Sequence, residues 1–502
     1  MDVLTIIVQA GGKGSRLEGL TRNKPKALVP VNNLPMLFHL FRTFPKHRFI
    51  VIGDYKFSVL EKYLAAFADV NYQLICATGE SGTCAGLHDA MEYISDNEAF
   101  MLIWCDLVLP DEFQMPEESA DYIGISKDFP CRWKYDDDRF EETRSQSQGV
   151  AGLFIFRNKE SIKDVPTHGE FVRWLQEKGM RFRELPLRKT REYGLYSEWD
   201  RLPKQRCRPF NRVEVHDNVF WKYPIDEQGR ALAKREAAWY RALNGMHFAN
   251  IPDIYQYEPL SMEYIKGKNV YEYTLLPTEQ KREILTQIIG CLQQVHSLGC
   301  IEADEDSYYD AYIGKTKKRL EKVYDLVPFA KNETVMINGR NCRNVFFHWD
   351  ELTRRVMEYK PARFELIHGD CTFSNTMLRE DMSPVLIDPR GYFGTTELYG
   401  DPAYDWVKLY YSLVSNYDAF NLKRFHLDIE KDHVDLEISS NGWENMEDEF
   451  FRLLDGQVDR KQMRLLLAIT WLSLTTYAWE DYDSICGAFY NGLFYLEEAF
   501  TL

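Results

Sequence analysis

Apolar residues along the first 200 positions alternate between short continuous runs and amphipathic stretches. The runs Leu4–Val8, Arg48–Ile52 and Phe100–Trp104 predict buried strands, and the spacing in Phe57–Ala66 predicts an amphipathic helix. Strands that alternate with helices in this way predict an α/β domain with a mainly parallel sheet covered on both faces. The polar stretch Lys134–Gln148 interrupts the pattern and predicts a loop or lid over a site.

The pattern changes near residue 205, where the basic, proline-bearing stretch Arg201–Pro209 stands. Two strand-like runs, Arg212–Val215 and Val219–Tyr223, then precede a predicted helix over Arg230–Leu243, and the chain is mostly helical from Thr278 onward. A small β-rich lobe before a large helical lobe is a kinase-like layout. We therefore predict two domains, 1–205 and 206–502, the second with a small lobe at about 206–266 and a helical lobe at about 267–502.

Bulk properties narrow the class of protein. The 502 residues are too many for one core, and 45% hydrophobic with 27% charged residues is a globular composition. A net charge of −16 argues against binding of nucleic acid or anionic membranes.

The ten cysteines include no CxxC pair, which favours thiols in a reducing cytoplasm, and the start of the chain is typical of a strand rather than a signal peptide. The stretch Leu465–Trp479 is short for a membrane span. We expect a cytoplasmic protein; the sequence leaves open whether it forms a homo-oligomer.

The first motif is the run Gln9-Ala-Gly-Gly-Lys-Gly-Ser-Arg-Leu17, which directly follows a predicted strand. Glycines there leave backbone N–H groups open to a phosphate. Arg16 and Lys26 add fixed positive charge for a triphosphate and an acceptor phosphate. A glycine loop alone is also typical of an ordinary turn, and the nearby cations favour the functional reading. The residues that we expect to contact the nucleotide are Gln9, Ala10, Gly11, Gly12 and Gly14.

Asp106 follows the apolar run Phe100–Trp104, and ligands of α/β sheets bind at this carboxyl edge of the strands. The alternative role for this aspartate is a helix N-cap.

Together these features resemble the sugar-phosphate nucleotidyltransferase family, and the short domain is similar in length to its phosphocholine cytidylyltransferase branch. The resemblance covers about the first 200 residues. It implies a Rossmann-like fold, a base-binding segment over Glu80–Gly86 that includes Gly82 and Thr83, and Mg²⁺ bound by Asp106. The family usually adds a second metal-binding acid near the domain end; Asp200 is the candidate, and a plain surface acid is an equal alternative.

The reaction that this resemblance implies is attack by a substrate phosphate oxygen on the α-phosphorus of a nucleoside triphosphate. Positioning and charge neutralisation by Mg²⁺, Arg16 and Lys26 would carry the catalysis, without a covalent protein intermediate. The resemblance favours CTP, and the residues themselves do not identify the base.

The second motif joins His368-Gly-Asp370 with Asn375 and Asp388. Phosphoryl transfer needs one acid to orient the hydroxyl, with an amide and a second acid to hold Mg²⁺. The run Pro384–Ile387 predicts a strand that ends at Asp388, as this chemistry requires. The alternative is a polar loop with an Asx turn.

Residues upstream agree with a kinase-like site. Lys222 ends a predicted strand, and Glu236 lies on the next helix, where the two side chains can pair. Taken alone, each is also typical of a protein surface. The segment with Glu263 and Ile265 predicts the linker between lobes, whose backbone would hold adenine.

This half, roughly residues 208–502, resembles the aminoglycoside phosphotransferase and choline kinase superfamily. The resemblance implies a bilobal protein-kinase-like fold, with Asp370 as catalytic base and with Asn375 and Asp388 as Mg²⁺ ligands. Two features depart from the family: no glycine-rich loop lies between residues 212 and 220, and Ile387–Gly391 replaces the usual IDWEY run. Its Arg390 would meet an anionic or polyhydroxylated substrate and would repel choline.

An aromatic-rich stretch near the C-terminus carries Trp479, with Glu480 and Asp481 beside it. Such rings with an acid suit a quaternary-ammonium cage. The alternative is a helical core, because further rings recur at helical spacing.

Two separate phosphate-handling motifs predict a bifunctional enzyme. The second domain would phosphorylate a small hydroxylated metabolite with ATP, and the first would couple that phosphate to a nucleotide from CTP or another nucleoside triphosphate, giving an activated donor for a surface glycan or lipid. Three alternatives are a choline kinase with phosphocholine cytidylyltransferase, an antibiotic-type phosphotransferase with a regulatory N-terminal domain, and a nucleotide-sensing scaffold.

Overall fold

The computed structural model describes residues 4–77, 82–202 and 211–502. The chain divides into two compact units, Met1–Pro203 with Glu480–Asp483, and Lys204–Trp479 with Ser484–Leu502. The predicted boundary at residue 205 lies outside the described residues and stays a prediction.

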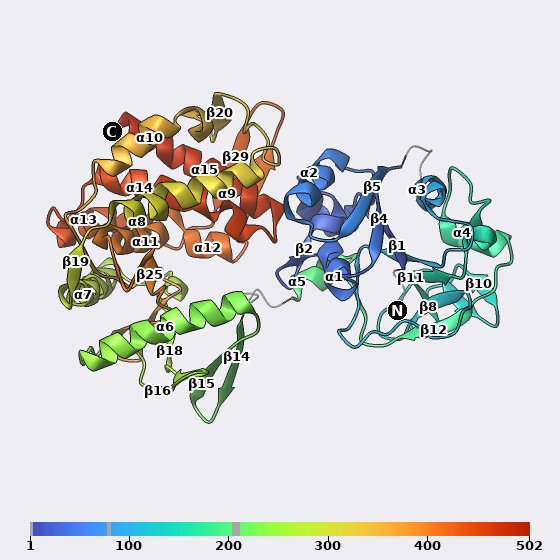
Figure 1. Ribbon diagram of the computed structural model, residues 1–502, viewed down its shortest axis with the longest axis horizontal. Coiled ribbons are helices and arrows are strands. Elements are labelled where there is room, and N and C mark those ends of the chain that lie inside the picture. The colour runs from blue at the N-terminus through green and yellow to red at the C-terminus, as the bar shows by residue number, and fades with distance from the viewer. Residues whose placement is uncertain (1–3, 78–81, 203–210) are drawn as a thin grey trace. The chain divides into compact units, whose positions relative to one another are not determined.

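The first unit is built on a nine-stranded sheet (Figure 1). An interior strand, β1 (Thr5–Gln9), pairs in parallel with β4 (Arg48–Gly53) on one side and with β6 (Phe100–Trp104) on the other. The strand β11 (Gly149–Phe156) pairs antiparallel with β6 and extends the sheet. The α/β class and the Rossmann-like sheet with its parallel centre are confirmed. The other strands are β5 (Asn71–Cys76), β8 (Tyr122–Ser126), β9 (Lys134–Asp136), β10 (Arg139–Glu141) and β12 (Arg183–Leu187).

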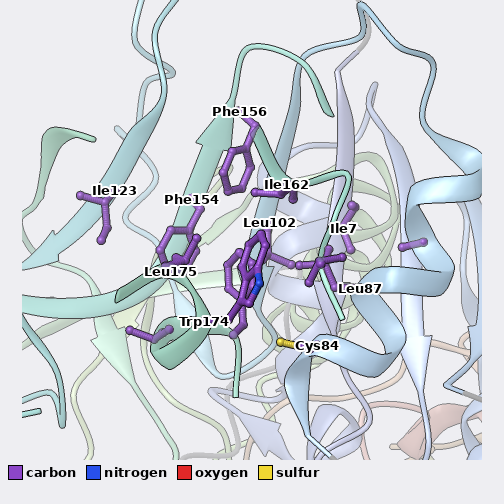
Figure 2. Packing of buried hydrophobic residues seen from close by; sticks show 14 of the residues in the cluster. Ile7, Cys84, Leu87, Leu102, Ile123, Phe154, Phe156, Ile162, Trp174 and Leu175 are labelled. Carbon is purple, nitrogen blue, oxygen red and sulfur yellow. The ribbon is translucent and has the colours of Figure 1, made fainter. Parts of the chain in front are cut away.

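The core of this unit lies between the sheet and its helices (Figure 2). Ile7 and Leu102 of the central strands and Phe154 of β11 pack with Leu87 and Trp174 from the helices, and burial of these apolar side chains stabilises the sheet. The helices are α1 (Met36–Thr43), α2 (Phe57–Phe67), α3 (Thr83–Ala90), α4 (Phe171–Glu177) and α5 (Tyr196–Asp200).

The stretch Lys134–Gln148, predicted as a loop or lid, instead begins with a hairpin of β9 and β10. Tyr135 and Phe140 are buried, and their ring centroids lie 4.7 Å apart. The prediction of a loop was wrong for residues 134–141, because the charged residues around these two rings conceal the inward-facing positions of a short hairpin. Residues 142–148 lie outside the helices and strands, as expected of a loop.

The second unit begins with a small antiparallel sheet in the order β14-β15-β17-β16 beside the long helix α6 (Glu227–Gly245) (Figure 1). Asp226 caps α6, since its side chain accepts the backbone N–H of Gly229 at 2.6 Å. This sheet and helix form the small lobe of a kinase-like fold. The strands are β14 (Asn211–His216), β15 (Val219–Pro224), β16 (Ile254–Tyr257) and β17 (Leu260–Glu263).

The rest of the second unit is mostly helical, and short strands carry the second motif. The strand β22 (Arg363–Leu366) leads into that motif, and the hairpin of β23 (Thr376–Arg379) and β24 (Pro384–Leu386) ends two residues before Asp388. Among the described residues, no helix combines the length and the apolar character of a membrane span. The main helices are α7 (Thr278–Ser297), α9 (Lys315–Val323), α10 (Trp349–Met357), α11 (Pro402–Ser415), α13 (Glu447–Leu454), α14 (Arg460–Leu474) and α15 (Tyr482–Thr501).

Candidate active sites

The glycine loop of the first unit follows β1 directly. Gly14 has φ of 66°, in the left-handed region that favours glycine, and the helical turn that begins at Ser15 follows it. A side-chain carbon added at Gly11 would lie 2.8 Å from Cβ of Asp54, whereas one added at Gly12 would meet no atom within 4 Å. The loop is therefore packed against the protein at one glycine and open at the other, as a phosphate-binding loop requires.

The end of β1 is tied to the start of α3. Ala10 is buried, and the side-chain amide of Gln9 donates to the carbonyl oxygen of Thr83 at 2.9 Å. Gly82 has φ of 121°, and a carbon added there would lie 2.3 Å from the carbonyl oxygen of Gly169, so only glycine fits. Gly82 and Thr83 thus lie beside the loop, while residues 80 and 81 of the same predicted segment fall outside the described residues.

Three charged side chains converge where β6 ends. Asp106 is 3% exposed, and the Lys26 ammonium forms an ion pair with its Oδ2. Glu192 reaches the same place because β13 (Arg191–Glu192) pairs with β7 (Leu107–Val108), the strand that directly follows Asp106. A carbon added at Gly194 would lie 2.5 Å from Oε1 of Glu192, 3.0 Å from Oδ2 of Asp106 and 3.5 Å from Nη2 of Arg16.

Burial and the neighbouring charges shift the pKa values of Glu192 and Lys26. Burial, and then the charge of Asp106, raises the pKa of Glu192 to about 7. Burial opposes the charge on Lys26, but the adjacent Asp106 carboxylate outweighs it and raises the pKa of that lysine. Asp106 pairs with the partly buried Lys26 and lies beside a second carboxylate, Glu192, so the two acids could together hold a further cation.

Sequence reasoning missed Glu192 and named Asp200 instead. Asp200 is the last residue of α5, and its side chain is exposed. Glu192 gives no local signal, because only the long-range pairing of β13 with β7 brings it to Asp106.

In the second unit, Lys222 on β15 joins two carboxylates. Its ammonium lies 2.8 Å from Oε2 of Glu236 on α6 and 2.7 Å from Oδ1 of Asp388. Lys222 is 9% exposed and Glu236 is 5% exposed. The pair expected from the sequence is present, and it links the small lobe to the second motif.

The loop between β22 and β23 places Asp370 beside Asn375 and Lys408. The Asn375 amide nitrogen donates to Oδ2 and to the backbone carbonyl of Asp370, both at 2.8 Å, and the Lys408 ammonium lies 3.0 Å from Oδ1. Burial opposes the charge on Lys408, and the Asp370 carboxylate raises the pKa of this lysine. Each carboxylate oxygen can accept a second hydrogen bond, so Asp370 can still receive a substrate hydroxyl.

Asp405 on α11 holds this loop in place. Its buried carboxylate accepts the backbone N–H groups of His368 at 2.8 Å and Gly369 at 2.6 Å, and His296 lies 3.0 Å from the same group. Burial alone would raise the pKa of Asp405, but these hydrogen bonds and the nearby histidines lower it. Asp405 therefore positions the loop.

The oxygen atoms of Asp388 and Asn375 suit a hard cation. The Asn375 nitrogen is engaged with Asp370, which leaves its amide oxygen as the ligand atom. The described residues contain no group of three or more histidine, cysteine, aspartate or glutamate side chains that would hold a metal alone. Mg²⁺ needs none, because one or two protein ligands with substrate phosphates and water complete its shell.

A pocket opens at this site and includes Lys222, Asp370, Asp388 and Arg390 in its lining. Trp479 is not among the described residues that line it, and Tyr477 of the same segment is. Glu263 and Ile265 of the predicted linker are not among the described residues that line this pocket: Glu263 forms an ion pair with Arg379, and Ile265 is buried. Their contact with a nucleotide stays a prediction.

The fold and the two sites define the class of each unit: an α/β nucleotide-transferring domain and a kinase-like phosphotransferase domain. Residues 6–115 match the MobA-like NTP transferase domain, and residues 214–433 match the phosphotransferase enzyme family. The chain is thus an NTP transferase domain fused to a phosphotransferase domain, and both domains belong to enzyme families.

Individual relatives match the first unit. Glucose-1-phosphate cytidylyltransferase of Salmonella typhimurium is 29% identical over 126 residues, covering 20% of this chain and 49% of the relative. D-glycero-alpha-D-manno-heptose 1-phosphate guanylyltransferase of Campylobacter jejuni is 26% identical over 100 residues, covering 19% and 45%. The chain spans about half the length of these curated relatives. The solved inositol-1-phosphate CTP transferase from T. maritima is 18% identical with a TM-score of 0.32, covering 39% of this chain and 91% of that one.

Proposed function

We propose that the chain is a bifunctional enzyme of the cytoplasm. Its second unit phosphorylates a hydroxyl of a small metabolite with ATP, and its first unit couples the new phosphate to CMP from CTP with release of pyrophosphate. The product is an activated donor for a surface glycan or lipid. The observation that carries the proposal is that each unit has its own complete charged site, one around Asp106 and one around Asp370.

In the kinase step, Asp370 orients the acceptor hydroxyl and takes its proton. The hydroxyl oxygen forms a bond to the γ-phosphorus while the bond from that phosphorus to the β,γ-bridging oxygen breaks, and ADP leaves. Lys222, fixed by Glu236 and Asp388, stands where it would neutralise phosphate charge. Asp388 and the Asn375 amide oxygen would hold Mg²⁺, which neutralises charge on the transferred group when bound.

In the nucleotidyl step, an oxygen of the acceptor phosphate forms a bond to the α-phosphorus of the nucleotide. The bond from that phosphorus to the α,β-bridging oxygen breaks, and pyrophosphate leaves without a proton transfer. The glycine loop would cradle the triphosphate, and Arg16 and Lys26 would neutralise it. Asp106, with Glu192 in place of the expected Asp200, would hold Mg²⁺.

CTP is proposed because the cytidylyltransferase of Salmonella typhimurium matches this unit. The guanylyltransferase match makes GTP the first competitor to test.

A coupled assay tests the proposal. Full-length protein with Mg²⁺, ATP and CTP would meet polyols, sugars, hydroxy acids, ethanolamine and choline, with ³¹P NMR as the readout. One compound that yields first a phosphate ester and then a diphosphate is the expected result. An ester without the diphosphate, with every nucleoside triphosphate supplied, would favour a lone kinase such as an antibiotic phosphotransferase. Neither product from any compound would contradict the proposal.

A further inference from the structure

Besides Lys222, four basic side chains line the same pocket as Asp370 and Asp388. Lys315 and Arg319 stand four residues apart on α9, so one face of that helix presents both. A turn of π-helix over Asp310–Gly314 directly precedes α9, and such turns are frequent at functional sites. Arg390 follows the second motif and Lys408 comes from α11. Three separate segments of the chain thus bring positive charge to one pocket.

Only one of these cations has a carboxylate partner within 4.0 Å among the described residues, and it is Lys408, paired with Asp370. The Arg319 guanidinium instead donates to the carbonyl oxygen and hydroxyl of Ser473, at 2.5 and 2.9 Å. The Arg390 guanidinium donates to the phenol oxygens of Tyr404 and Tyr392, both at 2.7 Å. Neutral oxygens orient these two guanidinium groups, and no carboxylate of the described residues forms an ion pair with either of them.

The pocket also holds buried donors without partners. Nε of Arg390 and the hydroxyl of Tyr411 are buried and make no hydrogen bond in the described part of the chain. Tyr411 is 1% exposed and lines the pocket. Buried polar groups are almost always satisfied in native proteins, so two such donors in one pocket indicate a ligand that accepts hydrogen bonds.

The charges around Lys315 also indicate an anionic ligand. Burial, and then the charges of Arg390, Arg319 and Lys408, lowers the pKa of Lys315 well below its usual range. Asp310 acts in the opposite direction and does not offset them. An anion bound among these side chains would favour the charged form of Lys315 and offset the cost of its burial.

We propose that this pocket selects an acceptor that already carries a negative charge: a small polyhydroxylated acid or phosphate ester. Lys315, Arg319 and Arg390 would hold the anionic group while an acceptor hydroxyl faces Asp370. The proposal rests on the kinase activity proposed above and narrows its substrate class. A tyrosine-lined pocket would otherwise suit a quaternary ammonium ion, but these cations repel one.

Paired ligands that differ only in charge test this assignment. Full-length protein saturated with Mg²⁺ and a non-hydrolysable ATP analogue would be titrated calorimetrically with D-gluconate against D-glucitol, with D-glycerate against glycerol, and with inorganic phosphate. We expect an acid to bind at least about tenfold more tightly than its neutral partner. Lys315→Gln and Arg319→Gln should each remove that preference. Lys318→Gln, on the exposed side of the same helix, is the matched control and should keep it.

Three results would overturn the anion site. The first is equal binding of an acid and its neutral partner, and the second is no binding of any anion. The third is weaker binding of the ATP analogue by the two pocket variants while both still bind the anion. The last would assign the cations to the phosphates of ATP. Turnover is measured separately, so the two proposals can fail independently. Anion binding without phosphorylation of any acceptor contradicts the kinase, whereas phosphorylation of neutral acceptors alone keeps the kinase and removes the anion site.

Discussion

The side-chain amide N–H groups of Asn375 donate hydrogen bonds to both the carboxylate and the backbone carbonyl of Asp370, at 2.8 Å in each case. The two bonds fix the orientation of the amide group and leave its oxygen as the ligand atom for a metal. One short loop thus holds the proposed base and a proposed Mg²⁺ ligand in a set geometry, so exchange of either side chain should affect phosphoryl transfer and leave the other unit unaffected.

Asp370→Asn should reduce phosphorylation by about 10³-fold or more, because the variant cannot accept the hydroxyl proton. Nucleotidyl transfer to a phosphate ester supplied from outside should keep its rate. The two rates can be followed separately by ³¹P NMR. Glu380→Gln, an exposed acid on the same unit, is the control and should change neither rate. Loss of both activities in folded Asp370→Asn protein would contradict two separate sites.

Lys26→Met should have the opposite effect, with nucleotidyl transfer reduced by about 10²-fold to 10³-fold and phosphorylation unchanged. The reason is that the partly buried Lys26 ammonium, paired with Asp106, is a cation of the first site. Pyrophosphate release from the nucleotide measures the effect. Lys46→Met changes an exposed lysine of the same unit and should have no effect. Normal pyrophosphate release by Lys26→Met would remove Lys26 from the proposed mechanism.

The Mg²⁺ requirement of nucleotidyl transfer should depend on pH through Glu192. Its raised pKa, about 7, means that the carboxylate is increasingly protonated as pH falls below 7, and a protonated carboxyl is a poor metal ligand. The Mg²⁺ concentration for half-maximal rate should therefore rise as pH falls from 8 to 6. Glu192→Gln should raise that concentration at every pH and flatten its pH dependence. An unchanged profile in this variant would show that Glu192 is not a ligand.

Asp405→Asn should destabilise the second unit by about 3 kcal/mol, because a buried charge that accepts two backbone N–H groups is lost. Chemical denaturation followed by tryptophan fluorescence measures the change. The lowered pKa determines how this stabilisation depends on pH. The Asp405 carboxylate stabilises the folded protein fully at pH values above the pKa that an aspartate has in the unfolded chain, and the stabilisation is lost as pH falls through the lower pKa of Asp405 in the folded protein. The difference in the free energy of unfolding between the variant and the wild type should therefore become smaller at acidic pH. A constant difference would mean that the charge of Asp405 is not the stabilising feature.

Local patterns in the sequence determined much of both sites. The apolar run that ends before Asp106 and the glycine loop after β1 are short-range signals, since strand periodicity and glycine conformations act over a few residues. The pairing of Lys222 with Glu236 could also be predicted, because a strand and the following helix pack together. The roles of these residues in catalysis stay predictions.

Only the tertiary structure decided which distant residues complete each site. Glu192 joins Asp106 through the pairing of β13 with β7, and Lys315 and Arg319 reach the pocket of Asp370 from α9. No local pattern marks these residues, because an isolated glutamate or lysine is most often a solvated side chain. Their burial and their charge environment arise from packing between segments far apart in the chain. The sequence therefore determined the folds and the phosphate-handling motifs, and the packing decided the acid that stands beside Asp106 and the positive charge of the pocket.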